Sequence, residues 1–294
     1  MKLAILADIH GNYIALQRCL EYAKKHGAEA YLFLGDYLGE LAYPDRTMDM
    51  IYTWHKNHAC YFVKGNKEDY WLGYGSGFEK SWIYGNSTTG TFLYQYERLR
   101  EKDLEFFKAL PIVQKVEVAD LPAITICHGS PRHVKEEMRE LDEKTIEILE
   151  ECETDMILCG HTHRRVTLEY DGKVVYNPGS VGIPLDSDSK AQFMLLQSKE
   201  GHWEPEFVDL EYDVEQVIAE MYEAGLDKYA PYWCRSTELL LRTGKISNGQ
   251  VLKRVMKLCN QEEGKCDWPY IPEKYWEWVI EQVEEELIKY TKTQ

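Results

Sequence analysis

Two histidines separated by one residue follow a short apolar run near the middle of the chain. The run, residues 156–160 (MILCG), is typical of a buried strand, and His161 and His163 come directly after it. Residues i and i+2 of an extended backbone point to the same side, so both imidazoles can face one site. Neutral imidazole is a common metal ligand. The pattern therefore predicts metal ligands at the end of this strand.

Four other apolar runs also end in potential metal ligands. These ligands are Asp8 and His10 after residues 2–7, Asp36 after 31–35, Asn66 after 59–65, and His128 after 122–127. Active sites of open α/β sheets form at the carboxyl ends of strands, so all seven side chains are expected to meet there. A lone histidine of this kind is more often a satisfied core group, but five such clusters in order favour a metal site.

The types of ligand atom narrow the choice of metal. Carboxylate, imidazole and amide donors suit Mn, Fe, Zn or Ni better than Ca. Two ions about 3.5–4 Å apart need a carboxylate that bridges them. Asp36 lies on a tight Gly-Asp turn and is the natural candidate for that bridge.

The elements that must position these residues alternate in the first half of the chain. Helical periodicity covers residues 12–27, 47–58 and 135–153, between the strand-like runs. Meandering strands follow from 156 to about 210, with a hairpin turn at 170–173. This mixture predicts an α/β domain with two sheets. Residues 66–91, with their GYGSG stretch, match no phosphate-binding fingerprint and are predicted to form a flexible loop.

The sequence changes character after about residue 211. Amphipathic, acidic helices are predicted there, and they contain Trp233, Trp268, Trp276 and Trp278. We expect a catalytic domain at 1–211 and a helical extension at 212–294. The extension is expected to pack on the main domain or to form a homo-oligomer contact, in preference to a substrate cap.

Composition excludes several classes of protein. The 294 residues carry a net charge of −16, which argues against a surface for long nucleic acids. The eight cysteines contain no C-x-x-C pair and are expected to be reduced. No apolar run resembles a signal peptide or reaches membrane-spanning length. The expectation is a cytoplasmic protein without membrane association.

The motifs together resemble a known family. The stretches DIHGN, GDYLG, GNKE, HGSP, GHTH and NPGSVG, spread over about residues 1–213, are similar to those of the calcineurin-like metallophosphoesterase superfamily, most closely its bacterial and archaeal phosphodiesterase branch. The resemblance implies a four-layer αββα sandwich with two divalent metal ions at the strand ends. It implies one ion among Asp8, His10, Asp36 and His163, and the other among Asp36, Asn66, His128 and His161.

The resemblance also implies direct hydrolysis. The two ions would lower the pKa of a bridging water, and the resulting hydroxide would attack phosphorus in line with the leaving oxygen. Asp36, Asn66, Lys67 and His128 are the residues implied to act in catalysis.

Residues in the ligand loops are candidates for substrate binding. The basic ones are Lys67, Arg132, Arg164 and Arg165, which would bind an anionic substrate or balance the carboxylates. Asn177, in NPGSVG, would contact substrate or support the ligand loops, and the supporting role is the favoured interpretation.

Lys67 departs from the family pattern, in which a histidine commonly follows Gly-Asn. A lysine is normally charged at neutral pH and would be a poor proton donor unless its pKa fell. Substrates with poor leaving groups are therefore expected to be cleaved inefficiently. Nucleoside polyphosphates have good leaving groups, and their cleavage is expected to suffer less.

The leading functional hypothesis is hydrolysis of phosphodiester or phosphoanhydride bonds of small molecules. Nucleotides, including dinucleoside polyphosphates, are the first class to consider. A protein phosphatase on the same metal centre, a nuclease, and a non-catalytic scaffold that retains the fold remain as alternatives. The composition offers the nuclease little support.

Overall fold

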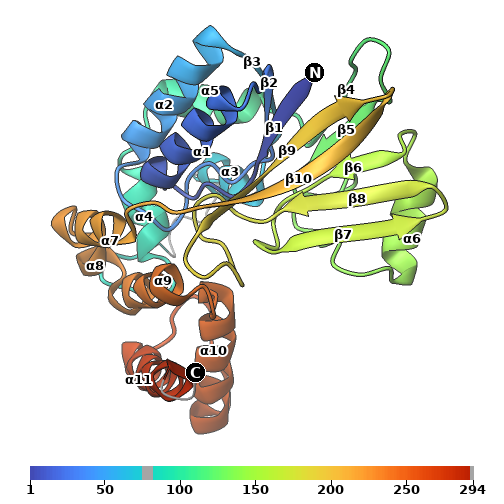
Figure 1. Cartoon of the computed structure of the whole chain (residues 1–294). Helices are drawn as coiled ribbons and strands as arrows, with labels where there is room; N and C mark the ends of the chain where they lie inside the picture. The colour runs from blue at the N-terminus through green and yellow to red at the C-terminus, as the bar shows by residue number, and fades with distance from the viewer. Residues whose placement is uncertain (75–81, 292–294) are drawn as a thin grey trace.

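The computed structural model describes residues 1–74 and 82–291, and its core consists of two five-stranded sheets (Figure 1). The first sheet has the order β10-β9-β1-β2-β3, with strands at His202–Leu210, Ala191–Lys199, Lys2–Leu6, Ala30–Phe33 and Ala59–Phe62. The second has the order β4-β5-β6-β8-β7, with strands at Val113–Val116, Ile124–Cys127, Met156–Leu158, Lys173–Pro178 and Arg165–Tyr170.

The central strands of both sheets are parallel. Leu3 lies opposite Ala30, and Ala30 opposite Ala59, in the β1-β2-β3 ladder. Strands β5, β6 and β8 form the equivalent parallel set in the second sheet. Antiparallel strands β9 and β10, β4 and β7 complete the edges. The parallel arrangement delivers the ends of β1, β2, β3, β5 and β6 to one side of the molecule.

Alternating side chains of the strands build a four-layer sandwich. In β1, Leu3 and Ile5 join the apolar core between the two sheets, whereas Ala4 and Leu6 face the helices over the first sheet. Those helices are α1 (Tyr13–Lys25), α2 (Pro44–Asn57), α3 (Asn66–Leu72) and α5 (Glu101–Ala109). Helix α6 (Glu143–Glu151) covers the second sheet. The predicted αββα arrangement is confirmed.

Two predictions about the connecting segments were wrong. Helix α6 begins only after Asp142, whose side chain caps it by accepting a hydrogen bond from the backbone N–H of Thr145, so most of 135–142 is irregular. The segment 66–91 is not simply a loop, because α3 begins it and α4 (Gly90–Tyr96) begins at its end. Most of GYGSG lies outside the described residues. The hairpin turn at 170–173 is confirmed, with Asp171 and Gly172 both at positive φ.

The helices after β10 form two small cores. They are α7 (Val214–Glu223), α8 (Leu226–Tyr229), α9 (Pro231–Thr243), α10 (Asn248–Glu263) and α11 (Glu273–Thr291). Helices α7 to α9 pack against Leu41, Tyr94, Ile183 and Leu185 of the preceding fold. Helices α9 to α11 pack on one another around Trp233 and Trp276. Helices α7 to α9 therefore pack on the main fold. The division of the chain at 211/212 and the oligomer contact stay predictions.

All eight cysteines are free thiols, as expected. Among the described helices, none combines the length and apolar character needed to cross a bilayer.

Candidate metal centre

Five of the seven predicted ligands have strained backbone at the strand ends. Asp8, His10, Asp36, His161 and His163 all have positive φ, between 52° and 69°. Left-handed backbone at residues other than glycine is rare and concentrates at functional sites. The argument from extended backbone was therefore wrong for Asp8/His10 and for His161/His163. Their side chains come together through left-handed turns, not through the alternation of a strand.

Three ligand side chains form one compact group. The Nε2 atoms of His10 and His163 are 3.0 Å apart. The Oδ1 atom of Asp8 lies 3.7 Å from His10 Nε2 and 3.4 Å from His163 Nε2. These three donor atoms converge on a shared point, as ligands of a single cation do.

A second group lies beside the first. His128 Nε2 lies 3.4 Å from Asp36 Oδ1 and 3.1 Å from Asn66 Oδ1, and its Nδ1 is 2.7 Å from the Leu34 carbonyl oxygen. The His161 ring packs edge-on to the His128 ring, with 5.1 Å between centroids. The second carboxylate oxygen of Asp36, Oδ2, lies 3.6 Å from His10 Nε2, so this side chain faces both groups.

The donor set fits divalent cations. Asp8 and Asp36 are almost fully buried, and Asp8 Oδ1 has no hydrogen-bond donor within the described residues. A buried carboxylate oxygen without a donor is costly unless a cation satisfies it. The neighbouring imidazole nitrogens supply the remaining ligand atoms.

The charges of the site reinforce this chemistry. Burial alone would raise the pKa of Asp8, but the imidazoles of His163 and His10 outweigh it and hold that pKa well below its ordinary value. Burial, assisted by His128, lowers the pKa of His161 to about 4. Asp8 is therefore ionised and His161 neutral at pH 7, the forms in which both bind metals.

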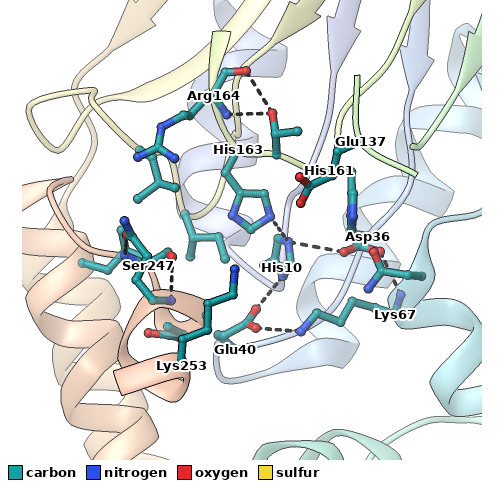
Figure 2. Close-up of a pocket in the computed structure, with 18 of the residues that line it drawn as sticks. His10, Asp36, Glu40, Lys67, Glu137, His161, His163, Arg164, Ser247 and Lys253 are labelled. Atoms are coloured by element: carbon teal, nitrogen blue, oxygen red, sulfur yellow. Dashed lines mark hydrogen bonds and ion pairs between the residues drawn. The ribbon is translucent and has the colours of Figure 1, made fainter. Parts of the chain in front are cut away.

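Glu40 is a site residue that the sequence interpretation missed. Its Oε2 lies 2.5 Å from His10 Nδ1, and its Oε1 lies 2.7 Å from Lys67 Nζ (Figure 2). Burial opposes the charged form of all three groups. The pair of contacts nevertheless raises the pKa of His10 to about 10, raises that of Lys67 and lowers that of Glu40. The ammonium of Lys67 is therefore stabilised, so its pKa does not fall as a proton donor would require.

Glu68, the last residue of GNKE, is a second missed residue. It is fully buried, and its carboxylate accepts hydrogen bonds from the backbone N–H groups of Asp36, Tyr37 and Gly65. Burial and the nearby Asp36 raise the pKa of Glu68 to about 7. This side chain fixes the turn that carries Asp36 to the loop that carries Asn66.

Two glycines of the motifs allow close approach. A Cβ on Gly39 would collide with the His10 ring, and a Cβ on Gly65 would collide with the Asp36 carboxylate. Both positions therefore admit only glycine without displacing a ligand.

Five of the seven predicted ligands line the floor of a cavity of about 460 Å³ (Figure 2). Residues of the ligand loops on this floor are His10, Asp36, Asn66, His161 and His163, together with Glu40 and Lys67. Helices α9 and α10 supply the opposite wall through Trp233, Leu240, residues 247–250 and Lys253. The extension thus contributes to the cavity. From the sequence, packing on the main domain had been favoured over a role as a substrate cap.

The other predicted substrate-binding residues differ in position. Arg164 lines the cavity and pairs with Asp186 at 2.8 Å. Arg132 and Arg165 are not among the described residues that line it. Arg132 pairs with Glu147 and Glu151 of α6, and Arg165 pairs with Asp209 of β10.

Asn177 is fully buried behind the ligand loop. Its side-chain N–H group donates to the carbonyl of Gly160 at 2.6 Å. In the same NPGSVG stretch, the Ser180 hydroxyl donates to the carbonyl of Asp8 at 2.7 Å. These contacts support the ligand loops and agree with the supporting role favoured for Asn177.

A family comparison decides what this arrangement is. The model of the calcineurin-like phosphoesterase superfamily domain matches residues 1–201. The chain belongs to this superfamily. As a calcineurin-like phosphoesterase it is a hydrolase of phosphate esters, and its two groups of candidate metal ligands lie within the matched residues.

Similar proteins occur in archaea and bacteria. An uncharacterized protein of Methanocaldococcus jannaschii is 26% identical over 247 residues, covering 79% of this chain and 94% of that protein. The crystal structure of a metallophosphoesterase from Sphaerobacter thermophilus has a TM-score of 0.64 at 23% identity, and covers 83% of this chain and 100% of its own. The crystal structure of a hypothetical protein from Pyrococcus horikoshii has a TM-score of 0.70 at 22% identity, and the match covers 84% of this chain and 99% of that one. Residues 1–211 are too few to account for the covered fraction of this chain in the two structural matches. The similarity of fold therefore extends into the C-terminal helices.

Proposed function

We propose that this calcineurin-like phosphoesterase hydrolyses phosphodiester or phosphoanhydride bonds of small molecules. Nucleotides, including dinucleoside polyphosphates, are the class that we expect. The observation that carries the proposal is the convergence of oxygen and nitrogen donors from five strand ends, four of which supply residues to the floor of one cavity. Such a site acts on an anionic group that enters the cavity.

In this proposal two divalent ions, of Mn, Fe, Zn or Ni, are bound. One would be held by Asp8, His10, Asp36 and His163, and the other by Asp36, Asn66, His128 and His161. The two carboxylate oxygens of Asp36, one facing His128 and the other His10, support a bridging role for this residue. Such ions make a water nucleophilic near neutral pH and neutralise charge on phosphoryl oxygens.

Lys67 would stabilise charge without giving up a proton. Its ammonium is held by Glu40 at the cavity floor, next to the ligands, and its raised pKa keeps it charged. A fixed positive charge there favours the negative charge that develops on phosphoryl or leaving oxygens. Without a proton donor at this position, a phosphate leaving group suits the site better than an alkoxide. This argument supports phosphoanhydrides and activated diesters as substrates.

The two facing walls of the cavity favour small substrates. Helices α9 and α10 face the ligand loops across it, so a phosphorylated side chain on a protein surface would meet these helices before it reached the ligands. This argues against a protein phosphatase. The presence of every expected ligand, with Asp8 Oδ1 buried and lacking a donor, argues against a non-catalytic scaffold.

The test is hydrolysis of a substrate panel by the purified protein with Mn²⁺ or with a chelator. The panel contains ATP, a cyclic nucleotide, a dinucleoside tetraphosphate, an aryl phosphodiester and a phosphopeptide, and the products are separated. We expect metal-dependent turnover of nucleotides, lost in Asp36→Asn. Fastest turnover of the phosphopeptide would indicate a protein phosphatase. No turnover with Mn²⁺, Zn²⁺, Fe²⁺ or Ni²⁺, although the ions bind, would indicate a scaffold.

A further inference from the structure

The wall opposite the candidate ligands carries an exposed lysine without a carboxylate partner among the described residues. Lys253, on the second turn of α10, lines the cavity, and its side chain extends into it on the side of His10 and His163 (Figure 2). It forms no ion pair within the part of the chain that the structure describes.

The other cations of the cavity each have a carboxylate partner. Lys67 pairs with Glu40 at 2.7 Å. Arg139 pairs with Glu137, and Arg164 with Asp186, both at 2.8 Å. Lys253 differs from them, because its charge is left for something that enters the cavity.

The carboxylates on the floor are not a sufficient partner for this ammonium. In the proposed function, Asp8 and Asp36 are engaged by divalent cations, whose charge exceeds that of the two carboxylates. The floor then repels Lys253 instead of attracting it. An anion between the floor and α10 would be attracted by both.

Hydrogen bonds hold the helix that bears Lys253 in place. Within the extension, the side-chain amide of Asn248 donates to Thr237 Oγ1 of α9, while its Oδ1 accepts from Ser236 Oγ, also of α9. Towards the floor, the backbone N–H of Leu185 donates to the carbonyl of His163, and that of Asp186 donates to the carbonyl of Gly244. A short chain of hydrogen bonds thus fixes the helix that bears Lys253 relative to a ligand loop.

The same cavity also has an apolar side. Ile183 and Leu185 line it from the main fold, and Trp233 and Leu240 line it from α9. Such side chains accept an organic group but not a bare phosphate ion. An occupant that suits the ligand floor, Lys253 and the apolar side chains has a scissile phosphate, a second anionic group and an apolar moiety.

We propose that Lys253 binds a second phosphate of the substrate, so that the extension selects organic polyphosphates over esters with a single phosphate. The proposal rests on the proposed function, because it takes the scissile phosphate to lie at the ligand floor. It assigns to α10 a specificity-determining role. Lys253 acts on binding of the distal phosphate and takes no part in bond cleavage.

The experiment compares Lys253→Ala and Lys253→Glu with Lys257→Ala. Lys257 is an exposed residue one turn further along α10, so its loss controls for the general charge of the helix. With Mn²⁺ bound, kcat/KM is measured for ADP and for an aryl phosphodiester that has no second anionic group. Binding of a non-hydrolysable methylene analogue of ADP is measured by calorimetry at several salt concentrations.

We expect the ratio of kcat/KM for ADP to that for the diester to fall about tenfold in Lys253→Ala, and further in Lys253→Glu. The analogue should bind about tenfold more weakly, with a smaller dependence on salt. Lys257→Ala should leave both quantities within about twofold of the parent protein. An unchanged ratio together with unchanged analogue binding would overturn the proposal, as would equal effects of Lys257→Ala.

The two proposals can fail separately. Metal-dependent turnover of the diester with no effect of Lys253→Ala on ADP or its analogue would remove the role of Lys253 and leave the proposed function intact. Analogue binding that depends on Lys253, without turnover of any substrate, would remove the proposed function and leave a polyphosphate-binding cavity.

Discussion

At the scale of single residues, the candidate centre is built from backbone that most residues avoid. Each ligand at positive φ costs about 1–3 kcal/mol. Backbone hydrogen bonds between the ligand loops offset this cost. The His10 N–H donates to the carbonyl of Asp36, and the Gly160 N–H donates to the carbonyl of His128. The donors are therefore held close together by the fold itself, before any ion adds its own attraction.

Glu40→Gln should lower metal affinity about 10–100-fold. The carboxylate of Glu40 contacts His10 Nδ1, so it holds Nε2 towards Asp8 and Asp36 and raises the basicity of the ring. Competition with a chromophoric chelator would measure the affinity for Mn²⁺ and Zn²⁺. Glu169→Gln, on the exposed face of β7, is the control. Equal affinities in the two variants would contradict a positioning role for Glu40.

Lys67→Met should reduce kcat/KM about 100-fold on nucleotides. The change keeps the length of the side chain but removes the ammonium beside the cavity floor. Because the pKa of Lys67 is raised above its ordinary value of 10.5, the parent protein should show no loss of activity from this residue as pH rises to 9. Steady-state rates of both proteins from pH 6 to 9 would test this. Lys108→Met, at an exposed position of α5, is the control for the loss of a lysine elsewhere. Equal rates for Lys67→Met and the parent would exclude the electrostatic role.

At the scale of elements, one buried acid links two helices of the extension. Glu238 of α9 accepts a hydrogen bond from Tyr222 of α7 at 2.6 Å, and it pairs with Arg235 and Arg242 of its own helix. Burial would raise its pKa, but these partners outweigh burial and lower it from the ordinary 4.5. The ionised form is therefore favoured by folding.

The free energy of unfolding should consequently depend on Glu238 in a pH-dependent way. A folded-state pKa below the unfolded value gives stability that is complete above pH 4.5 and is lost as pH falls through the folded value. Glu238→Gln should cost about 1–3 kcal/mol at pH 7 and less below pH 4. Urea unfolding at pH 7 and pH 3.5 would measure both. Glu215 forms an exposed pair with Arg242, so Glu215→Gln should cost less than about 1 kcal/mol at both pH values. A constant cost for Glu238→Gln at both values would contradict the linkage.

Some elements could be predicted from the sequence and others could not. The buried parallel strands appear as continuous apolar runs, so β1, β2, β5 and β6 were found with their ligands. Helices α3 and α4 were missed because each has only 7 residues and lies in a Gly- and aromatic-rich segment without clear periodicity. Helix α6 was predicted too long, because the acidic residues before Asp142 suit a helix as well as an irregular loop.

At the scale of the whole molecule, the cavity could not be predicted, because its two walls come from distant parts of the chain. The ligands follow strands and so carry a local signal. Glu40 and Lys253 carry none, since a glutamate after a Gly-Asp turn and a lysine on an amphipathic helix are ordinary surface residues in sequence. The role of Glu40 comes from its contacts with His10 and Lys67. That of Lys253 comes from the packing of α10 on α9, and of α9 against the loop that contains Ile183 and Leu185.

Metal binding should stabilise the whole molecule, since the candidate ligands join both sheets. An ion that binds the folded state at one hundred times its Kd adds about 2.7 kcal/mol to the free energy of unfolding. We expect Tm to rise by several degrees when Mn²⁺ is added to metal-free protein, and to return after chelation. The rise should grow from pH 6 to pH 8, because protons compete with the ion for the imidazoles. Differential scanning calorimetry would measure it, and Asp36→Ala should show a much smaller rise. A rise in Asp36→Ala equal to that in the parent protein would mean that the ion binds elsewhere, and no rise in either would argue against a metal centre at these strand ends.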